Sequence, residues 1–206
     1  ATGMSASYVL GQPNFTSNAA NTTQDGLTFP RGVSYDPDGE RLFVADTGNS
    51  RVLVYDVNPL TITSGANALN QFGQVDFVSN SSNLSQTEFN QPYDVAYVPL
   101  TKKLYVVDQG NNRVVEFDAA TSTIVDGSAA LHVLGQPDFT TSNCNVTQTD
   151  LCTPSGLSYD SGSGRLYVSD GGNNRVVSYV VGYGGVTADF ETQIHVLGQA
   201  NFTSNS

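Results

Sequence analysis

The sequence predicts an all-β fold in which one four-stranded sheet is repeated along the chain. Short apolar runs that are typical of strands alternate with turn sequences, and no stretch of about 11 residues or more shows helical periodicity. The dipeptide Gly-Gln recurs at intervals of 62 or 63 residues, each time followed three residues later by phenylalanine. Its four copies begin at Gly11, Gly73, Gly135 and Gly198.

Each element of the repeat is visible in the first complete copy. Gly32–Asp36 is predicted to be a short strand, and the turn Pro37–Gly39 connects it to the apolar run Arg41–Asp46. The tight turn Thr47–Ser50 then leads into Arg51–Asp56. Both of these middle runs are almost continuously apolar, which is typical of strands covered on both faces. The fourth, outer strand contains or precedes Gly-Gln, and its copies are Tyr8–Gly11, Gln71–Gly73, His132–Gly135 and His195–Gly198.

Four strands in each unit of several tens of residues are typical of a β-propeller. The run Leu42–Val52, preceded by Pro30–Val33, and its copies ending in Asp108–Val114 and Asp170–Val176 resemble NHL repeats. That resemblance covers three whole repeats and implies propeller blades, commonly six to a ring. We therefore expect an NHL-type propeller with an incomplete N-terminal blade. Its parts are an outer strand within residues 1–16 and three four-stranded blades at 17–78, 79–140 and 141–206.

Every repeat carries the same polar set at its tight turn. A carboxylate at the end of an apolar strand needs a partner, and an arginine five residues later can supply one. The glycine and asparagine between them are expected to allow the positive φ of a hairpin turn. Whether each arginine pairs within its own blade stays open. We interpret the set as structural, with ligand contact as the alternative; its members are Asp46, Gly48, Asn49, Arg51, Asp108, Gly110, Asn111, Arg113, Asp170, Gly172, Asn173 and Arg175.

The cysteines and the glycosylation motifs both indicate a secreted protein. Cys144 and Cys152 lie eight residues apart without any common zinc-ligand spacing, so we expect a disulfide, with two free thiols as the alternative. The sequence contains six Asn-x-Ser/Thr triplets, whereas chance alone would give about four in a chain of this composition. All six fall in or beside polar connections. They predict N-glycans, unless the protein comes from a cell that does not glycosylate it. The candidates are Asn14, Asn21, Asn80, Asn83, Asn145 and Asn201, with Asn14, Asn80 and Asn145 favoured.

The charge argues against a nucleic-acid partner. The chain has 8 Lys and Arg against 19 Asp and Glu, a formal net charge of −11. NHL propellers that bind RNA use a basic face, and phosphate binding needs cations. Only Arg31 and Lys102 lie outside the two repeat positions occupied by Arg51, Arg113, Arg175, Arg41, Lys103 and Arg165. No apolar run approaches the ~20 residues that span a membrane, so no membrane span is expected.

The sequence offers no recognisable catalytic set. Some NHL-type propellers are lyases with metal-binding histidines in the central channel, and related six-bladed folds are calcium-dependent lactonases. His132 and His195, however, occupy the same repeat position, which places them on the outer strands of successive blades. Asp36–Gly39 is similar to a calcium loop but lacks its remaining ligands, so a hairpin turn is the better interpretation. We expect no enzyme activity and no cofactor, with Ca²⁺ as the open alternative.

The expected function is binding or assembly by a non-catalytic scaffold. Three blades cannot close a ring that usually needs at least four, and one outer strand is left over. Both open ends should therefore be covered by a second copy, in a ring or a filament, or by further blades of a longer chain. A piece of a larger propeller hydrolase or lyase is the alternative. Apolar residues expected at the open ends are Val44, Val52, Val168 and Val176.

Overall fold

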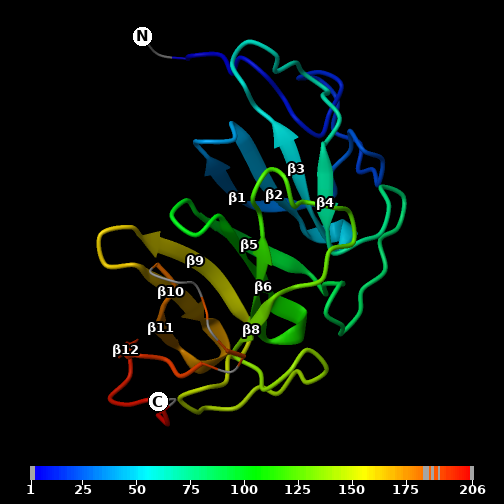
Figure 1. The fold of residues 1–206 in the computed structure, drawn as a ribbon. Coiled ribbons are helices and arrows are strands. Elements are labelled where there is room, and N and C mark those ends of the chain that lie inside the picture. Colours follow the sequence, from blue (N-terminus) through cyan, green and yellow to red (C-terminus); the bar gives the residue numbers. More distant parts are fainter. Residues whose placement is uncertain (1–2, 183–185, 187, 190, 205–206) are drawn as a thin grey trace.

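Three four-stranded antiparallel sheets follow one another along the molecule, each made from one repeat (Figure 1). The structure, a computed structural model, describes residues 3–182, 186, 188–189 and 191–204. Blade 1 contains β1 (Pro30–Asp36), β2 (Arg41–Asp46), β3 (Arg51–Asp56) and β4 (Asn70–Phe72). Blade 2 contains β5 (Pro92–Val98), β6 (Lys103–Asp108), β7 (Arg113–Asp118) and β8 (His132–Leu134). Blade 3 contains β9 (Pro154–Asp160), β10 (Arg165–Asp170), β11 (Arg175–Val180) and β12 (His195–Leu197).

The strands of each blade pair in chain order, as the repeat predicts. The central hairpin is in unbroken register, from Arg41 opposite Asp56 to Asp46 opposite Arg51 in blade 1, and a short 3₁₀ turn closes it. Each inner strand begins earlier than predicted, at the proline, after an irregular pairing near its start. Each outer strand ends before its Gly-Gln glycine, because Gly73 has a φ of 89°, which lies outside the extended region. No α-helix occurs in the described residues.

The predicted N-terminal outer strand does not form. Tyr8–Gly11 pairs with no strand in the described part of the chain, because the neighbour it needs, the third strand of a preceding blade, is not there. The segment lies beside blade 1, at the end of the molecule opposite blade 3 (Figure 1). Its backbone bonds to the connection before β4 instead, since the Gly65 amide donates to the Val9 carbonyl at 3.0 Å.

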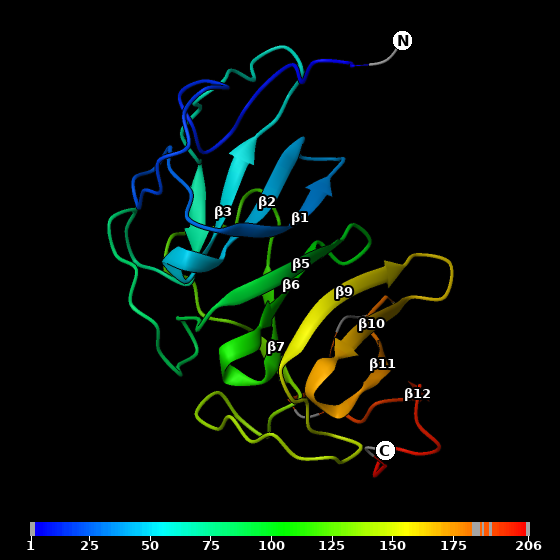
Figure 2. The same cartoon turned by 180° about the vertical axis from the view of Figure 1, so that it is seen from behind.

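The inner strands β1, β5 and β9 lie side by side, and the core fills the spaces between successive blades (Figure 2). Phe72 of blade 1 packs on Phe117 of blade 2 with ring centroids 4.8 Å apart. A second cluster joins blade 2 to blade 3 through residues such as Tyr105 and Tyr179. A third cluster, around Leu53, covers the far side of blade 1.

The expectation for the apolar ends is wrong in part. Val52 and Val168 are fully buried between blades, not at the ends. Val44 does face the open side of blade 1, but the chain itself covers it with Leu10 and Leu27. Of the four predicted residues, Val176 is the one that remains half-buried on an open face, because no blade follows blade 3 within the chain.

Candidate functional site

The repeated Asp and Arg pair within their own hairpin. Arg51 Nε donates to Asp46 Oδ2 at 2.8 Å, and the equivalent bonds in the other blades are 2.7 Å long. Both side chains are fully buried in blade 1. Asp46 Oδ1 accepts a hydrogen bond from the Thr28 amide, and Asn49 Nδ2 donates to Asp46 Oδ2. A buried carboxylate is thus saturated by donors from its own turn and from the segment that enters its blade.

The remaining guanidinium nitrogens hold loops together. Arg51 donates through Nη1 and Nη2 to the carbonyls of Thr22, Thr23 and Gly26, before β1, and of Phe77, after β4. Arg113 and Arg175 each make the equivalents of three of these four bonds, those to Thr23, Gly26 and Phe77, in their own blades. Because these donors are engaged by the chain, the set performs a structural role in every blade.

The role expected for the turn glycine is wrong. Gly48, Gly110 and Gly172 do not have positive φ; the residue two places later does, as at Ser50, where φ is 51°. The glycine is needed because the turn packs against the preceding segment. A Cβ at Gly48 would lie 2.4 Å from Thr28 Cγ2 and 2.8 Å from the Thr28 carbonyl oxygen. Close approach, not backbone conformation, requires glycine here.

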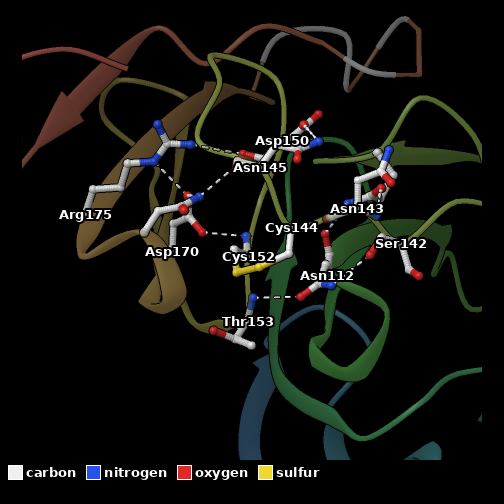
Figure 3. The surroundings of a disulfide bond; sticks show 12 residues. Asn112, Ser142, Asn143, Cys144, Asn145, Asp150, Cys152, Thr153, Asp170 and Arg175 are labelled. Carbon is white, nitrogen blue, oxygen red and sulfur yellow. Dashed lines mark hydrogen bonds and ion pairs between the residues drawn. A yellow bond between two sulfur atoms is a disulfide. The ribbon is translucent and has the colours of Figure 1, made fainter. Parts of the chain in front are cut away.

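Cys144 and Cys152 form a disulfide at the junction of blades 2 and 3, where the sequence places one (Figure 3). Cys144 is exposed and Cys152 is buried. The Cys152 amide donates to Asp170 Oδ1 at 2.7 Å, which is part of the blade 3 Asp–Arg set. Asn112, in the tight turn of blade 2, accepts the Thr153 amide at 2.8 Å. The bridge therefore closes a loop that several hydrogen bonds already hold against both blades.

All six candidate glycosylation asparagines are exposed. The glycan would be carried by the side-chain nitrogen, Nδ2. In Asn83 and Asn145 this nitrogen donates to Glu88 at 3.0 Å and to Asp150 at 2.8 Å. No hydrogen bond from Nδ2 to the described residues occurs at the other four, which are Asn14, Asn21, Asn80 and Asn201.

The histidines lie on different outer strands, as the repeat register predicts. His132 begins β8 and its Nδ1 lies 3.3 Å from Asp189, whereas His195 begins β12 and lies 3.3 Å from Ser178. Within the described residues no group of three or more His, Cys, Asp or Glu side chains could hold a metal ion. The described chain likewise contains no helix with the length and apolarity to cross a membrane.

The calcium-like turn is an ion pair and a hairpin. Arg41 Nε donates to Asp36 at 3.0 Å, and the amides of Asp38 and Gly39 donate to the same carboxylate. Desolvation opposes ionisation of Asp36, but these hydrogen bonds outweigh it and lower its pKa below the ordinary value. Arg41 also donates to the Ala119 carbonyl at 2.8 Å, so the pair ties blade 1 to blade 2.

Asp94 is a half-buried acid that connects two blades. It lies on β5, and its carboxylate accepts the Leu157 amide of β9 at 2.7 Å. Desolvation by burial raises its pKa. Because β5 and β9 belong to different blades, Asp94 joins the inner strands of blades 2 and 3. The sequence shows no sign of this role, since the repeats place glycine at the equivalent positions, Gly32 and Gly156.

The best candidate for a binding site is the open side of blade 3. We define the forward face of a blade as the side toward the following blade. In blade 2 this face is formed by Tyr105, Val107, Val114, Glu116 and Leu134, all buried against blade 3. The matching forward face of blade 3 is formed by Tyr167, Ser169, Val176, Ser178 and Leu197.

No blade in the described part of the chain covers this forward face of blade 3. Leu134 is 1% exposed in blade 2, whereas its counterpart Leu197 is 58% exposed. A shallow hollow of about 210 Å³ lies over the face, lined in part by Tyr167, Ser169 and Val176. Serines replace two of the larger side chains of blade 2, and in the sheet Ser178 lies opposite Tyr167 and Ser169 opposite Val176. Ser178 is nevertheless buried. The sequence pattern identified Val176 but not Tyr167 or Leu197, whose exposure depends on where the array ends.

Known proteins share both the sequence pattern and the fold. The family model described as NHL repeat matches residues 27–55 and 151–179. NHL repeat-containing protein 2 of Bos taurus is 30% identical over 101 residues, which are 48% of this chain and 13% of that protein. The same-named protein of Gallus gallus is 34% identical over 92 residues, 45% of this chain and 11% of that protein. The chain therefore corresponds to a small part of the length of these curated relatives.

Solved structures resemble the fold at low sequence identity. Kuenenia stuttgartiensis hydrazine synthase matches 92% of this chain and 40% of its own, with 14% identity and a TM-score of 0.50. A chain of a nidogen/laminin complex matches 89% of this chain and 52% of its own, with 17% identity and a TM-score of 0.49. The repeat match and the three successive four-stranded sheets agree with each other. The chain carries NHL repeats, matched at residues 27–55 and 151–179, and its three repeats fold as propeller-like blades.

Proposed function

We propose that the chain is a non-catalytic scaffold, secreted and N-glycosylated, that works by binding through its open blade ends and by associating with further copies of itself. The forward face of blade 3 is the observation that carries this proposal. Tyr167, Val176 and Leu197 stand on a sheet surface whose counterparts in blades 1 and 2 are buried by the following blade. An uncovered surface of this kind marks an interaction site.

The charge distribution and the engaged arginines favour a protein partner over a nucleic acid. All three motif arginines use their guanidinium groups on the chain's own carboxylates and carbonyls. Arg31 stacks on Tyr93, with Cζ 4.2 Å from the ring centroid. Few cations are left to neutralise phosphates, and the net charge is −11.

Secretion and glycosylation are supported by the disulfide and by the exposed acceptors. A disulfide that joins an exposed cysteine to a buried one at a blade junction is stable where the surroundings are oxidising. All six acceptor asparagines lie on the surface, where a glycan can be attached without disturbing the blade cores.

Light scattering coupled to intact mass measurement of the native protein tests this proposal. A mass of twice the monomer or a polymer supports self-association, because the chain alone has a mass of 21.8 kDa. A monomer of that mass at all concentrations, with no further chain attached, overturns the scaffold proposal. A longer native polypeptide with a closed set of blades also overturns it, because further blades of the same chain would then cover the open ends.

A further inference from the structure

The two ends of the chain carry nearly the same sequence. Residues 8–17 read YVLGQPNFTS and residues 195–204 read HVLGQANFTS, identical at eight of ten positions. They also fold alike locally. Asn14 Oδ1 accepts the Thr16 amide at 2.9 Å, and Asn201 Oδ1 accepts the Thr203 amide at 2.9 Å. One segment could therefore take the place of the other wherever the surroundings are the same.

Residues 8–17 lie on blade 1 at the position that corresponds to the contact of an outer-strand segment with the following blade. A Cβ at Gly73 would meet Phe89 of blade 2, and one at Gly135 would meet Leu151 of blade 3. A Cβ at Gly11 would meet Leu27 of blade 1 in the same way. Leu10 is half-buried against the cluster that covers this side of blade 1. The N-terminal segment thus covers blade 1 as a preceding blade would.

Backbone contacts repeat the same correspondence. The Gln71 and Val133 amides donate to Asp126 and Asp189, in the connections of the following blades. The Val9 amide donates to Ser64 Oγ at 3.3 Å, at the matching place before β4. Residues 8–17 therefore make the same kind of contact with blade 1 as the internal outer-strand segments make with the blades that follow them.

The glutamines show that each end makes half of a complete junction. Gln136 Nε2 donates to the Asn112 carbonyl of its own blade and to the Asn143 carbonyl of the following one. Gln74 makes the same two bonds, to Ser50 and Ser81. Within the described chain, Gln12 bonds only to the following-blade carbonyl, that of Ala19, and Gln199 only to its own-blade carbonyl, that of Asn174.

We propose that residues 195–204 of one copy displace residues 8–17 from blade 1 of a second copy. Gln199 would then reach the Ala19 carbonyl of the second copy and complete its pair. Leu197 would enter the site that Leu10 leaves, and blade 1 of the second copy would cover the forward face of blade 3. This inference rests on the proposed self-association and names residues 8–17 as its built-in competitor. Two such junctions would join two chains of three blades into a six-bladed ring.

The exchange makes opposite predictions for two equivalent leucines. Leu10→Ser weakens the competitor and should raise the association constant by up to about tenfold, as expected for losing one half-buried leucine contact. Leu197→Ser removes the incoming side chain and should lower the association constant by a similar factor. Leu60→Ser is the matched control, because the Leu60 side chain is 92% exposed and has almost no contact to lose, and it should leave association unchanged.

Sedimentation equilibrium of the four proteins measures association, and hydrogen exchange of the associated wild type locates the segments. Protection should rise over residues 195–204 and fall over residues 8–17 as concentration increases. If the wild type associates but both leucine variants match it, or residues 8–17 stay protected, the exchange is wrong while the scaffold proposal stands. If the wild type is monomeric and Leu10→Ser associates, residues 8–17 block association in the wild type; this supports their role as competitor and overturns the self-association of the wild type. Monomers throughout overturn both.

Discussion

Arg51 and Asp46 form a buried ion pair across the two ends of a single tight turn, with Nε and Oδ2 2.8 Å apart. The same guanidinium binds four backbone carbonyls from the segments before β1 and after β4. Each blade therefore has one cation that closes its hairpin and anchors the loops at its edge. The stability of a blade should depend on this pair more than on any exposed charge.

Replacing Arg113 by alanine should cost about 3–5 kcal/mol of unfolding free energy, because it leaves Asp108 as a buried charge without its cation. Urea unfolding followed by circular dichroism measures the change. Lys103→Ala is the control, since Lys103 lies 3.8 Å from a partly exposed Asp118 and should cost less than about 1 kcal/mol. Equal losses in the two variants would contradict the role assigned to the motif arginine.

Gly48→Ala should destabilise the chain by about 1–3 kcal/mol through overpacking, because the new methyl group would press on backbone and side-chain atoms of Thr28. Gly162→Ala is the matched control. Its Cβ would approach only the end of the Asp160 side chain, at 3.3 Å, and should be tolerated. Thermal unfolding of both variants checks this. Full stability of Gly48→Ala would show that the glycine is dispensable.

Loss of the disulfide should lower stability by about 2.5 kcal/mol, the loop-closure value for a segment of about nine residues. The blades should nevertheless stay folded, because Arg175 continues to bind the carbonyls of Thr147 and Asp150 in this loop. Unfolding of a Cys144→Ser/Cys152→Ser variant measures the loss, and its circular dichroism checks the blades. Alkylation of the native protein without reductant should modify neither cysteine; labelling of both would refute the bridge.

Glycan occupancy should be higher at Asn14 and Asn80 than at Asn83 and Asn145, because the last two engage Nδ2 with a carboxylate in the folded chain. For Asn145 this replaces the preference expected from the sequence. Glycopeptide mass spectrometry of protein secreted from a eukaryotic host gives occupancy at each site. Treatment with a glycan-releasing amidase should lower the intact mass. An unchanged mass would rule out N-glycosylation in that host.

The Asp36–Arg41 pair should make stability depend on acid. The pKa of Asp36 in the folded chain lies below the ordinary value of 3.8. The ion pair therefore stabilises the folded chain above pH 3.8, and this stabilisation is lost as the pH falls through the pKa of the folded state. Asp36→Asn should therefore be less stable than wild type at pH 7, with the difference shrinking at acid pH. Urea unfolding at a series of pH values measures it. A constant difference would show that the carboxylate does not titrate with folding.

Much of the fold can be predicted from the sequence by itself. Period and local chemistry are enough, because a strand, a tight turn and an Asp–Arg pair five residues apart are short-range features that each repeat restates. The four strands of each blade and the placement of His132 and His195 on separate outer strands follow from the repeat register, and the disulfide is expected from the spacing of the two cysteines. These features need no knowledge of neighbouring blades.

Tertiary structure decides what depends on contact between blades. Tyr8–Gly11 has the sequence of a strand but forms none, since a strand requires a partner for its ladder. Gly48 is required by the nearness of Thr28, not by its own φ. Leu134 is buried and its equivalent Leu197 is exposed, although the sequences around them are nearly identical. Whether a side chain is buried depends on the neighbouring blade as well as on the residue itself, and the local sequence does not show which neighbour is present.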